Sequence, residues 1–276
     1  MYITMLKTIC NLRVFHTSCV LIKPKPVKYA GILSKNKQRY IDLLRDNTCR
    51  ILMVQSPPGT GKTFHAVEEG INHLEERTYD QLIFTRPMIP TDETENIGYL
   101  PGNESAKIGI YYQHIMDILN ELLVPRKLET YLEDSKIKFM PLGFIRGRTF
   151  KNSYIVGDEF QNASPHIMRT FLTRIGENTK MVITGDISQT DTQLSVSGLE
   201  DFITRLARHS HLDTIKSIDM GLDDIIRDPI VGDILNVYNS DSVFSSPDEY
   251  FPILSTNTRN VGKTDSANLR SLLGTN

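Results

Sequence analysis

Short apolar runs recur along the middle of the chain, each of the length of a β-strand. They cover Ile51–Gln55, Gln81–Thr85, Ile137–Met140, Tyr154–Gly157 and Met181–Thr184, with a weaker run at Thr214–Ile218. Most of the runs are unbroken instead of alternating with polar residues, which is the pattern of strands buried on both faces. We therefore expect these segments to form one sheet that is covered on both sides.

Amphipathic stretches lie between the apolar runs. Over Lys62–Glu76 the apolar positions fall on one helical face; they are Phe64, Val67, Ile71 and Leu74. A second helix is predicted at Pro165–Ile175, with Ser164 as its N-cap and Gly176 as its terminator. The alternation of strands and helices predicts an α/β fold, a three-layer sandwich with a mainly parallel sheet.

The segment QSPPGTGKT, residues 55–63, follows the first predicted strand and opens the first helix. It resembles the phosphate-binding template G-x-x-x-x-G-K-[ST], with Ser56 in place of the first glycine. Gly59 and Gly61 let backbone amides approach a phosphate, while Lys62 reaches the β- and γ-phosphates. Thr63 places its hydroxyl on Mg²⁺. The alternative is a turn that matches by chance. The residues expected to bind the nucleotide are Ser56, Pro57, Pro58, Gly59, Thr60, Gly61, Lys62 and Thr63.

Two further polar groups follow predicted strands. Asp158 and Glu159 end the run SYIVGDEFQ, where one carboxylate can hold Mg²⁺ and the other can polarise the attacking water. In MVITGDISQ, Gln189 can contact the γ-phosphate or its water, although Gly-Asp also marks an ordinary turn. Because parallel strands end at the same sheet edge, we expect Thr63 and Asp158 to converge there as metal ligands. Glu159 is then the candidate that activates water.

With these motifs in place, residues 36–238 resemble the PhoH-like ATPase family, whose P-loop core is similar to the superfamily-one helicases. The resemblance rests on LIFTRPMIP followed by IGYLPG, then PLGFIRGRTF, IVGDEFQN, FLTRIG, KMVITGD and IIRDPIV. It implies a RecA-like P-loop NTPase that uses ATP and Mg²⁺ and couples ATP hydrolysis to RNA or DNA. The alternative is a nucleotide-gated switch or scaffold that binds a protein partner without motor activity.

The resemblance also implies roles for single residues outside the loop. Gln38 matches a glutamine that reads the adenine, the alternative being a solvated helix residue. Arg227 matches a late arginine that stabilises γ-phosphate charge, the alternative being a surface arginine near a helix cap. Arg146 and Arg148 would contact phosphates of ATP or of nucleic acid, or form structural pairs. Arg86 follows a strand end in TRP and has no assigned role.

Beside the two carboxylates the chain departs from the family pattern. Gly157 stands where the family usually has leucine, and Phe160 stands where it usually has alanine. Because Phe160 adjoins the carboxylates, we expect it to change the access of water to the site.

Composition and charge narrow the possible partners. With 39% hydrophobic and 23% charged residues, the chain has the composition of a globular protein able to bury a core. Its net charge of −2 gives no global attraction to nucleic acid or membrane, so a nucleic-acid surface has to be a local patch. No apolar run approaches the roughly 20 residues of a membrane span. The three cysteines lack the spacing of a metal site.

Two-lobed helicases bind ATP between two cores, and this chain has room for one. We therefore expect a homo-oligomer in which an arginine of a neighbouring subunit completes the site.

The ends of the chain differ from its middle. No acidic residue precedes Asp42, whereas eight Lys and Arg residues do, the composition of an organelle transit peptide or of a short basic arm. We expect this leader or arm over residues 1–33, the ATPase domain over 34–240, and a polar, loosely ordered tail over 241–276. The expected location is the cytoplasm, or an organelle if the N-terminus is a targeting signal.

Overall fold

The computed structural model describes residues 33–87, 112–190, 196–209, 211–226, 228 and 230–239. In this part of the chain, six parallel strands form one sheet in the order β3-β2-β4-β5-β1-β6. Each predicted strand is present, with ends within two residues of those expected. The strands are β1 (Ile51–Gln55), β2 (Gln81–Thr85), β3 (Ile137–Phe139), β4 (Ser153–Gly157), β5 (Thr179–Gly185) and β6 (Ile215–Asp219). The expected α/β class is confirmed.

The central strands direct successive side chains into two separate cores. In β1, Leu52 and Val54 belong to one core, while Ile51 and Met53 belong to the other. Because both faces are buried, these strands read as unbroken apolar runs. β6 lies at the sheet edge, and of its residues only Ile218 is buried, which explains its weaker sequence signal.

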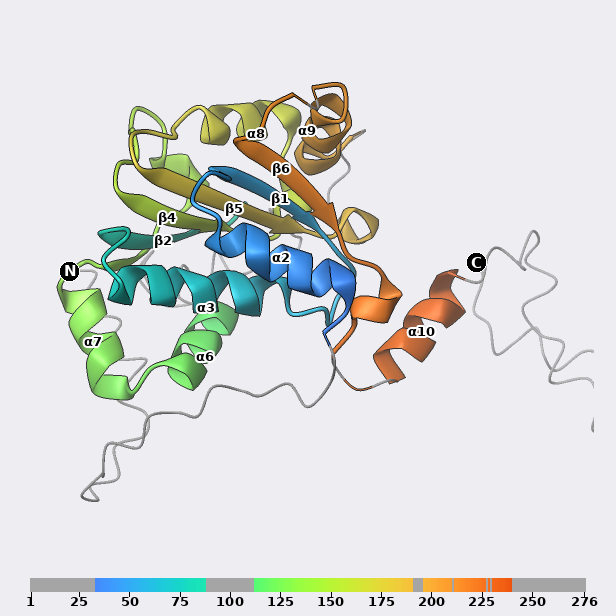
Figure 1. The fold of residues 1–276 in the computed structure, drawn as a ribbon, viewed down its shortest axis with the longest axis horizontal. Coiled ribbons are helices and arrows are strands. Elements are labelled where there is room, and N and C mark those ends of the chain that lie inside the picture. The colour runs from blue at the N-terminus through green and yellow to red at the C-terminus, as the bar shows by residue number, and fades with distance from the viewer. Residues whose placement is uncertain are drawn as a thin grey trace, which may run out of the picture. The chain divides into compact units, whose positions relative to one another are not determined.

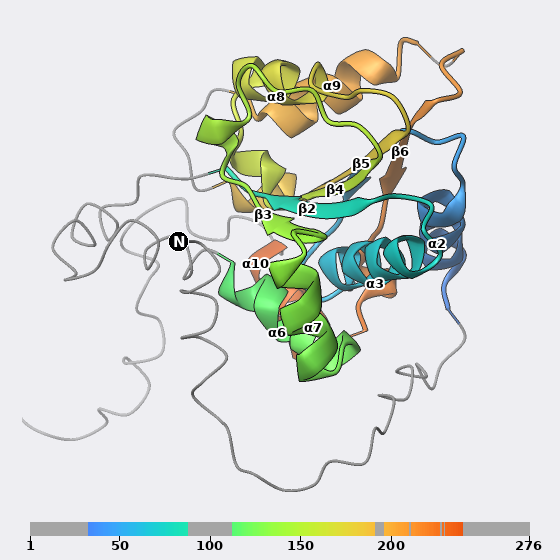
Figure 2. The ribbon, with the colours of Figure 1, turned by 90° about the vertical axis from the view of Figure 1, so that its left-hand side faces the viewer.

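Helices cover both faces of the sheet, which gives three layers (Figures 1 and 2). Four of them pack against one face; they are α2 (Lys35–Arg45), α3 (Lys62–Glu75), α6 (Gln113–Leu122) and α7 (Pro125–Glu133). On the opposite face lie α8 (Pro165–Leu172) and α9 (Gly198–Leu206). A further helix, α10 (Ile230–Asn239), runs across the boundary between two compact units, Met1–Gly232 and Asp233–Asn276.

α8 is shorter than the sequence predicts. Its N-cap is Ser164, whose hydroxyl accepts a hydrogen bond from the backbone N–H of Ile167 at 3.3 Å. The helix ends at Leu172, and Ile175 pairs with Phe150 in an isolated parallel bridge. A Cβ on Gly176 would collide with the backbone carbonyl of Phe150. Gly176 therefore permits the close approach of two chain segments and is not the helix terminator that its position suggested.

A buried lysine connects α2 to the sheet. Lys180 of β5 is fully buried, and its Nζ donates hydrogen bonds to the carbonyl oxygens of Leu43 and Asp46, each at 2.7 Å. Carbonyl groups at a helix C-terminus have no partner within the helix, so Lys180 satisfies groups that α2 leaves open. Burial lowers the pKa of Lys180 to about 8.

Replacing this lysine tests its role. Lys180→Met leaves the carbonyls of Leu43 and Asp46 without their donor, so we expect the free energy of unfolding to fall by about 1–3 kcal/mol at pH 7. The pKa of Lys180 is about 8 in the folded chain and near 10.5 when unfolded. Between these values the unfolded chain binds more protons, so the wild type gains stability as pH rises.

Denaturant titrations at pH 7 and pH 9.5 measure both effects. From pH 7 to 9.5 the wild type should gain about 2 kcal/mol relative to Lys180→Met. Lys35→Met, at an exposed position on α2, is the control and should keep the wild-type pH profile. Identical profiles for wild type and Lys180→Met would contradict this account of the buried ammonium.

Candidate nucleotide site

The loop from β1 to α3 turns sharply at the carboxyl edge of the sheet. Gly59 and Gly61 have φ values of 84° and 79°, a left-handed conformation that glycine adopts without steric cost. Gly61 is the N-cap of α3 and has no side chain to occupy the first amides of the helix. Those amides and the helix dipole favour an anion at this point, as a phosphate-binding loop requires.

Ser56 is an integral part of this loop. It is buried, and its N–H donates to the carbonyl oxygen of Gly185 at 3.2 Å. Its Oγ lies 2.8 Å from Oγ1 of Thr60. Since the Thr60 hydroxyl donates to the carbonyl oxygen of Pro57, Ser56 is the donor between the two hydroxyls. Lys62 Nζ donates to the Ser56 carbonyl at 3.4 Å. The serine in place of the first glycine thus supports the loop from within.

Asp158 is the centre of a polar cluster at the end of β4. Only 2% of it is exposed, and its Oδ1 accepts hydrogen bonds from Thr63 at 2.8 Å and Thr184 at 2.7 Å. Its Oδ2 lies 2.7 Å from Nε2 of His114. The structure therefore brings together Thr63 and Asp158, which the sequence assigns to the metal. His114 is an addition, because a histidine in a helix without a motif gives no sequence signal.

The surroundings of Asp158 keep it ionised. Burial alone would raise its pKa, but the hydrogen bond and charge of His114 lower the pKa again, together with the hydroxyls of Thr184 and Thr63. The net effect is a pKa below the ordinary value of an aspartate. A carboxylate that stays charged at neutral pH suits a metal ligand.

The oxygen donors fit a magnesium ion that is held partly by the nucleotide. In the described residues, no group of three or more His, Cys, Asp or Glu side chains is arranged to hold a metal. Mg²⁺ usually takes one or two protein oxygens and completes its octahedron with phosphate oxygens and waters. The hydroxyl of Thr63 and the carboxylate of Asp158 are sufficient for that mode of binding.

Glu159 has an unusual backbone conformation. Its φ of 56° and ψ of 36° are left-handed, which is uncommon for a residue other than glycine and costs on the order of 1–3 kcal/mol. Its Oε2 accepts a hydrogen bond from Nε2 of Gln161 at 2.6 Å. A strained residue whose side chain is held by a neighbour is characteristic of functional sites.

Gln161 connects the two polar segments that follow β4 and β5. Its Nε2 donates to Glu159 and also, at 3.4 Å, to the carbonyl oxygen of Gln189. Its Oε1 accepts from the backbone N–H of Asp186 at 3.2 Å. A Cβ on Gly185 would lie 2.8 Å from that Oε1, so glycine makes the contact possible. The sequence analysis did not identify Gln161 as a site residue. The one feature that pointed to it was its position two residues after Glu159, the second of the two carboxylates.

The other candidate residues lie in different settings. The side chain of Gln189 is exposed on η4 (Ile187–Gln189). Gln38 is exposed on α2 and donates to Asp42 at 2.9 Å, as expected of a solvated helix residue. Arg227 lies outside the described residues, but the preceding Ile226 donates its N–H to the carbonyl oxygen of Gly59 at 3.0 Å. The start of the IIRDPIV segment therefore contacts the phosphate loop.

Phe160 points away from the carboxylates. It is fully buried among the residues that pack under α8, with its ring centroid 4.9 Å from that of Phe171. The expectation that it changes water access to the site is therefore wrong. A Cβ on Gly157 would lie 2.6 Å from the Phe160 ring, so the two departures from the family pattern fit each other.

The structure combines a phosphate-binding loop after β1 of a parallel sheet with an Asp–Glu pair at the end of β4, and Thr63 joins the two through its bond to Asp158. This combination defines a P-loop NTPase. Within this class, the chain belongs to the PhoH-like protein family, whose model matches residues 31–239. The resemblance seen in the sequence is thereby confirmed.

Relatives of the chain come from several bacteria. A PhoH-like protein of Bacillus subtilis is 33% identical over 213 residues, which are 77% of this chain and 65% of that protein. A PhoH-like protein of Mycobacterium leprae is 34% identical over 74% of this chain and 56% of its own length. Protein PhoH of Escherichia coli is 30% identical over 75% and 58%. The chain thus spans between about half and two thirds of the length of these relatives.

Among solved structures, the Pif1 helicase of Candida albicans is similar over 74% of this chain and 43% of its own, with 15% identity and a TM-score of 0.37.

Within the described residues, none of the helices combines the length and apolar character needed to cross a membrane.

The pairing of Gly157 with Phe160 can be tested by a double-mutant cycle. Phe160→Ala leaves a cavity and should cost about 3–5 kcal/mol of unfolding free energy, while Gly157→Leu overpacks the same space. The double variant should be more stable than the sum of the two losses predicts, by about 0.5–3 kcal/mol. Gly157→Leu combined with Phe84→Ala, on the opposite face, is the control and should be additive. Additivity in both pairs would mean that positions 157 and 160 do not share space.

The role of Ser56 can be tested by Ser56→Gly. The backbone contacts of position 56 with Gly185 and Lys62 remain, so nucleotide affinity and any turnover should be roughly unchanged. Loss of the hydroxyl bond to Thr60 should lower the unfolding free energy by about 1 kcal/mol. Titration with a fluorescent ATP analogue and chemical denaturation measure the two quantities. A large gain in activity would show that serine impairs the loop.

Proposed function

We propose that this chain is a Mg²⁺-dependent ATPase that couples ATP hydrolysis to RNA or DNA in a helicase-like manner. One observation carries the proposal. The hydroxyl of Thr63, in the first turn after the phosphate loop, donates to Asp158 at 2.8 Å, and Asp158 adjoins Glu159. The proposed metal ligand of the loop thereby lies beside the second proposed ligand, and the candidate base is the next residue along the chain.

In the proposed mechanism, the backbone of the loop and Lys62 bind the phosphates of ATP. Thr63 and Asp158 hold Mg²⁺, which neutralises charge on the phosphate oxygens. Glu159 takes the proton of the attacking water, and its orientation is supported by the hydrogen bond from Gln161. Gln189 senses the γ-phosphate. Catalysis of this kind rests on positioning and charge stabilisation.

Two residues outside this cluster complete the proposed site. Gln38 contacts the adenine, and Arg227 stabilises charge on the γ-phosphate. We also propose that the chain acts as a homo-oligomer in which an arginine from a neighbouring subunit completes the site.

Nucleic acid is favoured over a protein partner by local charge. Residues 135–157 contain the cations Lys136, Lys138, Arg146, Arg148 and Lys151 and no carboxylate, in a chain whose net charge is −2. Of these, Arg146 and Arg148 are exposed and form no ion pair with any residue that the structure describes, so they can contact the phosphate backbone.

An ATPase assay with and without single-stranded RNA or DNA tests the function. The wild type should hydrolyse ATP only with Mg²⁺ and faster with nucleic acid. Lys62→Ala should lose binding or turnover. Glu159→Gln should bind ATP and lose turnover by about 10²-fold or more. Glu129→Gln, an exposed carboxylate on α7, is the matched control and should behave as wild type.

The outcomes separate the parts of the proposal. Normal hydrolysis by Glu159→Gln would exclude Glu159 as the base. Slow turnover that nucleic acid does not stimulate, with ATP-dependent binding to a protein, would favour the switch or scaffold. A monomeric mass together with full activity would exclude the oligomer.

A further inference from the structure

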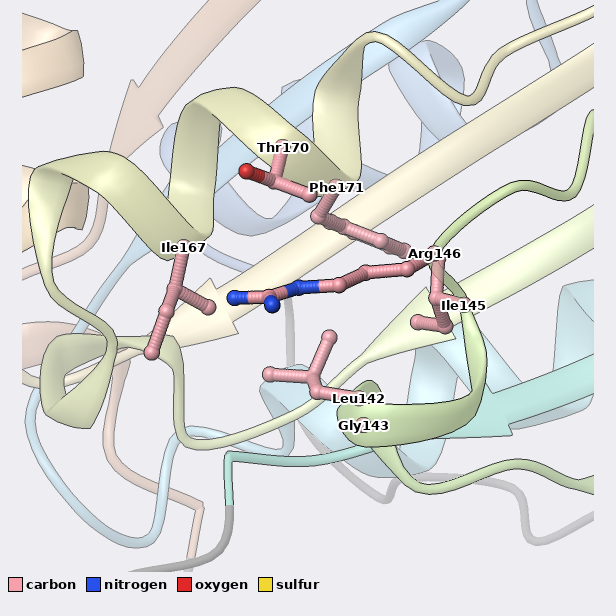
Figure 3. A pocket seen from close by; sticks show the side chains of 7 residues that line it. All are labelled: Leu142, Gly143, Ile145, Arg146, Ile167, Thr170 and Phe171. Atoms are coloured by element: carbon pink, nitrogen blue, oxygen red, sulfur yellow. The ribbon is translucent and has the colours of Figure 1, made fainter.

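A cavity of about 210 Å³ opens between the segment after β3 and helix α8 (Figure 3). Its walls are mostly apolar and come from two parts of the chain. They are Leu142, Gly143, Ile145 and Arg146 on one side and Ile167, Thr170 and Phe171 on the other. The side chain of Arg146 extends across the cavity, and its guanidinium reaches toward Ile167 (Figure 3). The cavity therefore offers apolar walls for a flat group and a guanidinium plane above them.

An exposed aromatic side chain adjoins this cavity. Phe144, on η2 (Leu142–Phe144), is 62% exposed, although it stands between the lining residues Gly143 and Ile145. Ile167, on the α8 side, is also exposed, to 37%. Phe144 and Ile167 therefore add exposed apolar surface on the two segments that line the cavity.

Of the residues that line the cavity only Arg146 is charged, while Arg148 follows the lining segment after β3 and Arg169 lies on α8. From Ser135 to Gly176 the only carboxylates are Asp158 and Glu159 of the nucleotide site, against seven cations: Lys136, Lys138, Arg146, Arg148, Lys151, Arg169 and Arg174. Arg146, Arg148 and Arg169 are exposed and form no ion pair with any residue that the structure describes. Burial, and then the charge of Arg148, lowers the pKa of Lys138, a sign that like charges lie close together. This surface is therefore complementary to an anion.

We propose that this surface, formed by Leu142–Arg148 and α8, binds single-stranded nucleic acid. One base enters the cavity and another stacks on the exposed ring of Phe144, while Arg146, Arg148 and Arg169 contact phosphates. The inference rests on the proposed coupling to nucleic acid and adds where, and in which form, the polymer binds.

The combination of an aromatic ring, a guanidinium and an apolar cavity selects this ligand. Every base has a π-face that stacks on aromatic side chains or on arginine, whatever its sequence. In a duplex the bases are paired and stacked on each other, so only an unpaired base can enter the cavity. The carboxylates of an acidic protein would pair with the cations, but they would not stack on the exposed ring of Phe144.

The surface lies close to the nucleotide site. η2 follows β3, and α8 begins eight residues after β4 ends, so both start at the carboxyl edge where Asp158 lies. Phe171, in the wall of the cavity, packs on Phe160, which is bonded to the strained Glu159. A base in the cavity would thus act on Glu159 through two aromatic rings in contact.

Binding of labelled oligonucleotides by the full chain tests the inference. Fluorescence anisotropy would use fluorescein-labelled oligouridylate, oligothymidylate and a duplex of equal length. Phe144→Leu should weaken single-strand binding by about 5- to 150-fold, the range of one stacked base, while Phe144→Tyr should restore it. Arg146→Gln should weaken binding and reduce the slope of log K against log salt by about 0.7.

Controls separate this surface from general charge and from misfolding. Arg126→Gln removes an exposed cation from α7, on the opposite face, and should keep the wild-type affinity. Thermal unfolding of each variant checks that the fold is intact, and Phe144 is exposed enough that its replacement should not shift the melting temperature. Wild-type binding to the duplex should be weaker than to either single strand.

The binding readout does not require ATP hydrolysis, so the two proposals can fail separately. Strong binding that Phe144→Leu weakens, in a chain without ATPase activity, would support this surface and overturn the proposed function. The inference is overturned if the wild type does not bind the oligonucleotides or if Phe144→Leu binds them as well as the wild type does. Displacement of the probe by polyglutamate, equally from wild type and Phe144→Leu, would instead assign the surface to an acidic protein.

Discussion

The arrangement of the nucleotide site depends on one buried charge. Asp158 is enclosed where β4 ends, and a buried carboxylate is costly unless hydrogen bonds stabilise it. Its partners come from three different elements, with Thr63 on α3, Thr184 on β5 and His114 on α6. The same bonds that keep the carboxylate charged therefore hold the phosphate loop, the central strands and a helix of the outer layer in fixed relation.

The fold and the principal motifs could be predicted because they follow from local rules. Strands buried on both faces read as apolar runs, and a phosphate loop needs glycines at positions such as Gly59 and Gly61, where φ is positive. His114 and Gln161 could not be predicted in the same way. His114 contacts Asp158, which lies 44 residues further along the chain. The side chain of Gln161 turns back to Glu159, at the end of the strand that precedes it. The end of α8 was misplaced because Gly176 serves a tertiary contact with Phe150.

Phe160 shows a further limit of reading a motif by position alone. Its place beside the carboxylates suggested an effect on the site, whereas its ring fills space that Gly157 leaves in the core. The backbone turns at Glu159, whose φ is 56°, so residues on its two sides belong to different environments. Asp158 is bonded to Thr63 and Thr184, whereas Phe160 packs on Phe171 in the core.

The contact of Lys180 with α2 has a consequence for the boundary of the folding unit. α2 precedes the first strand, and the phosphate loop and the carboxylate pair lie outside it, so it resembles a dispensable extension. Yet its last-turn carbonyls are the partners of an ammonium that β5 holds inside the core. A fragment that began at Ile51 would keep the complete sheet and the phosphate loop. The ammonium of Lys180 would then lack both of its carbonyl acceptors. The smallest autonomous form of this P-loop core therefore starts upstream of Lys35.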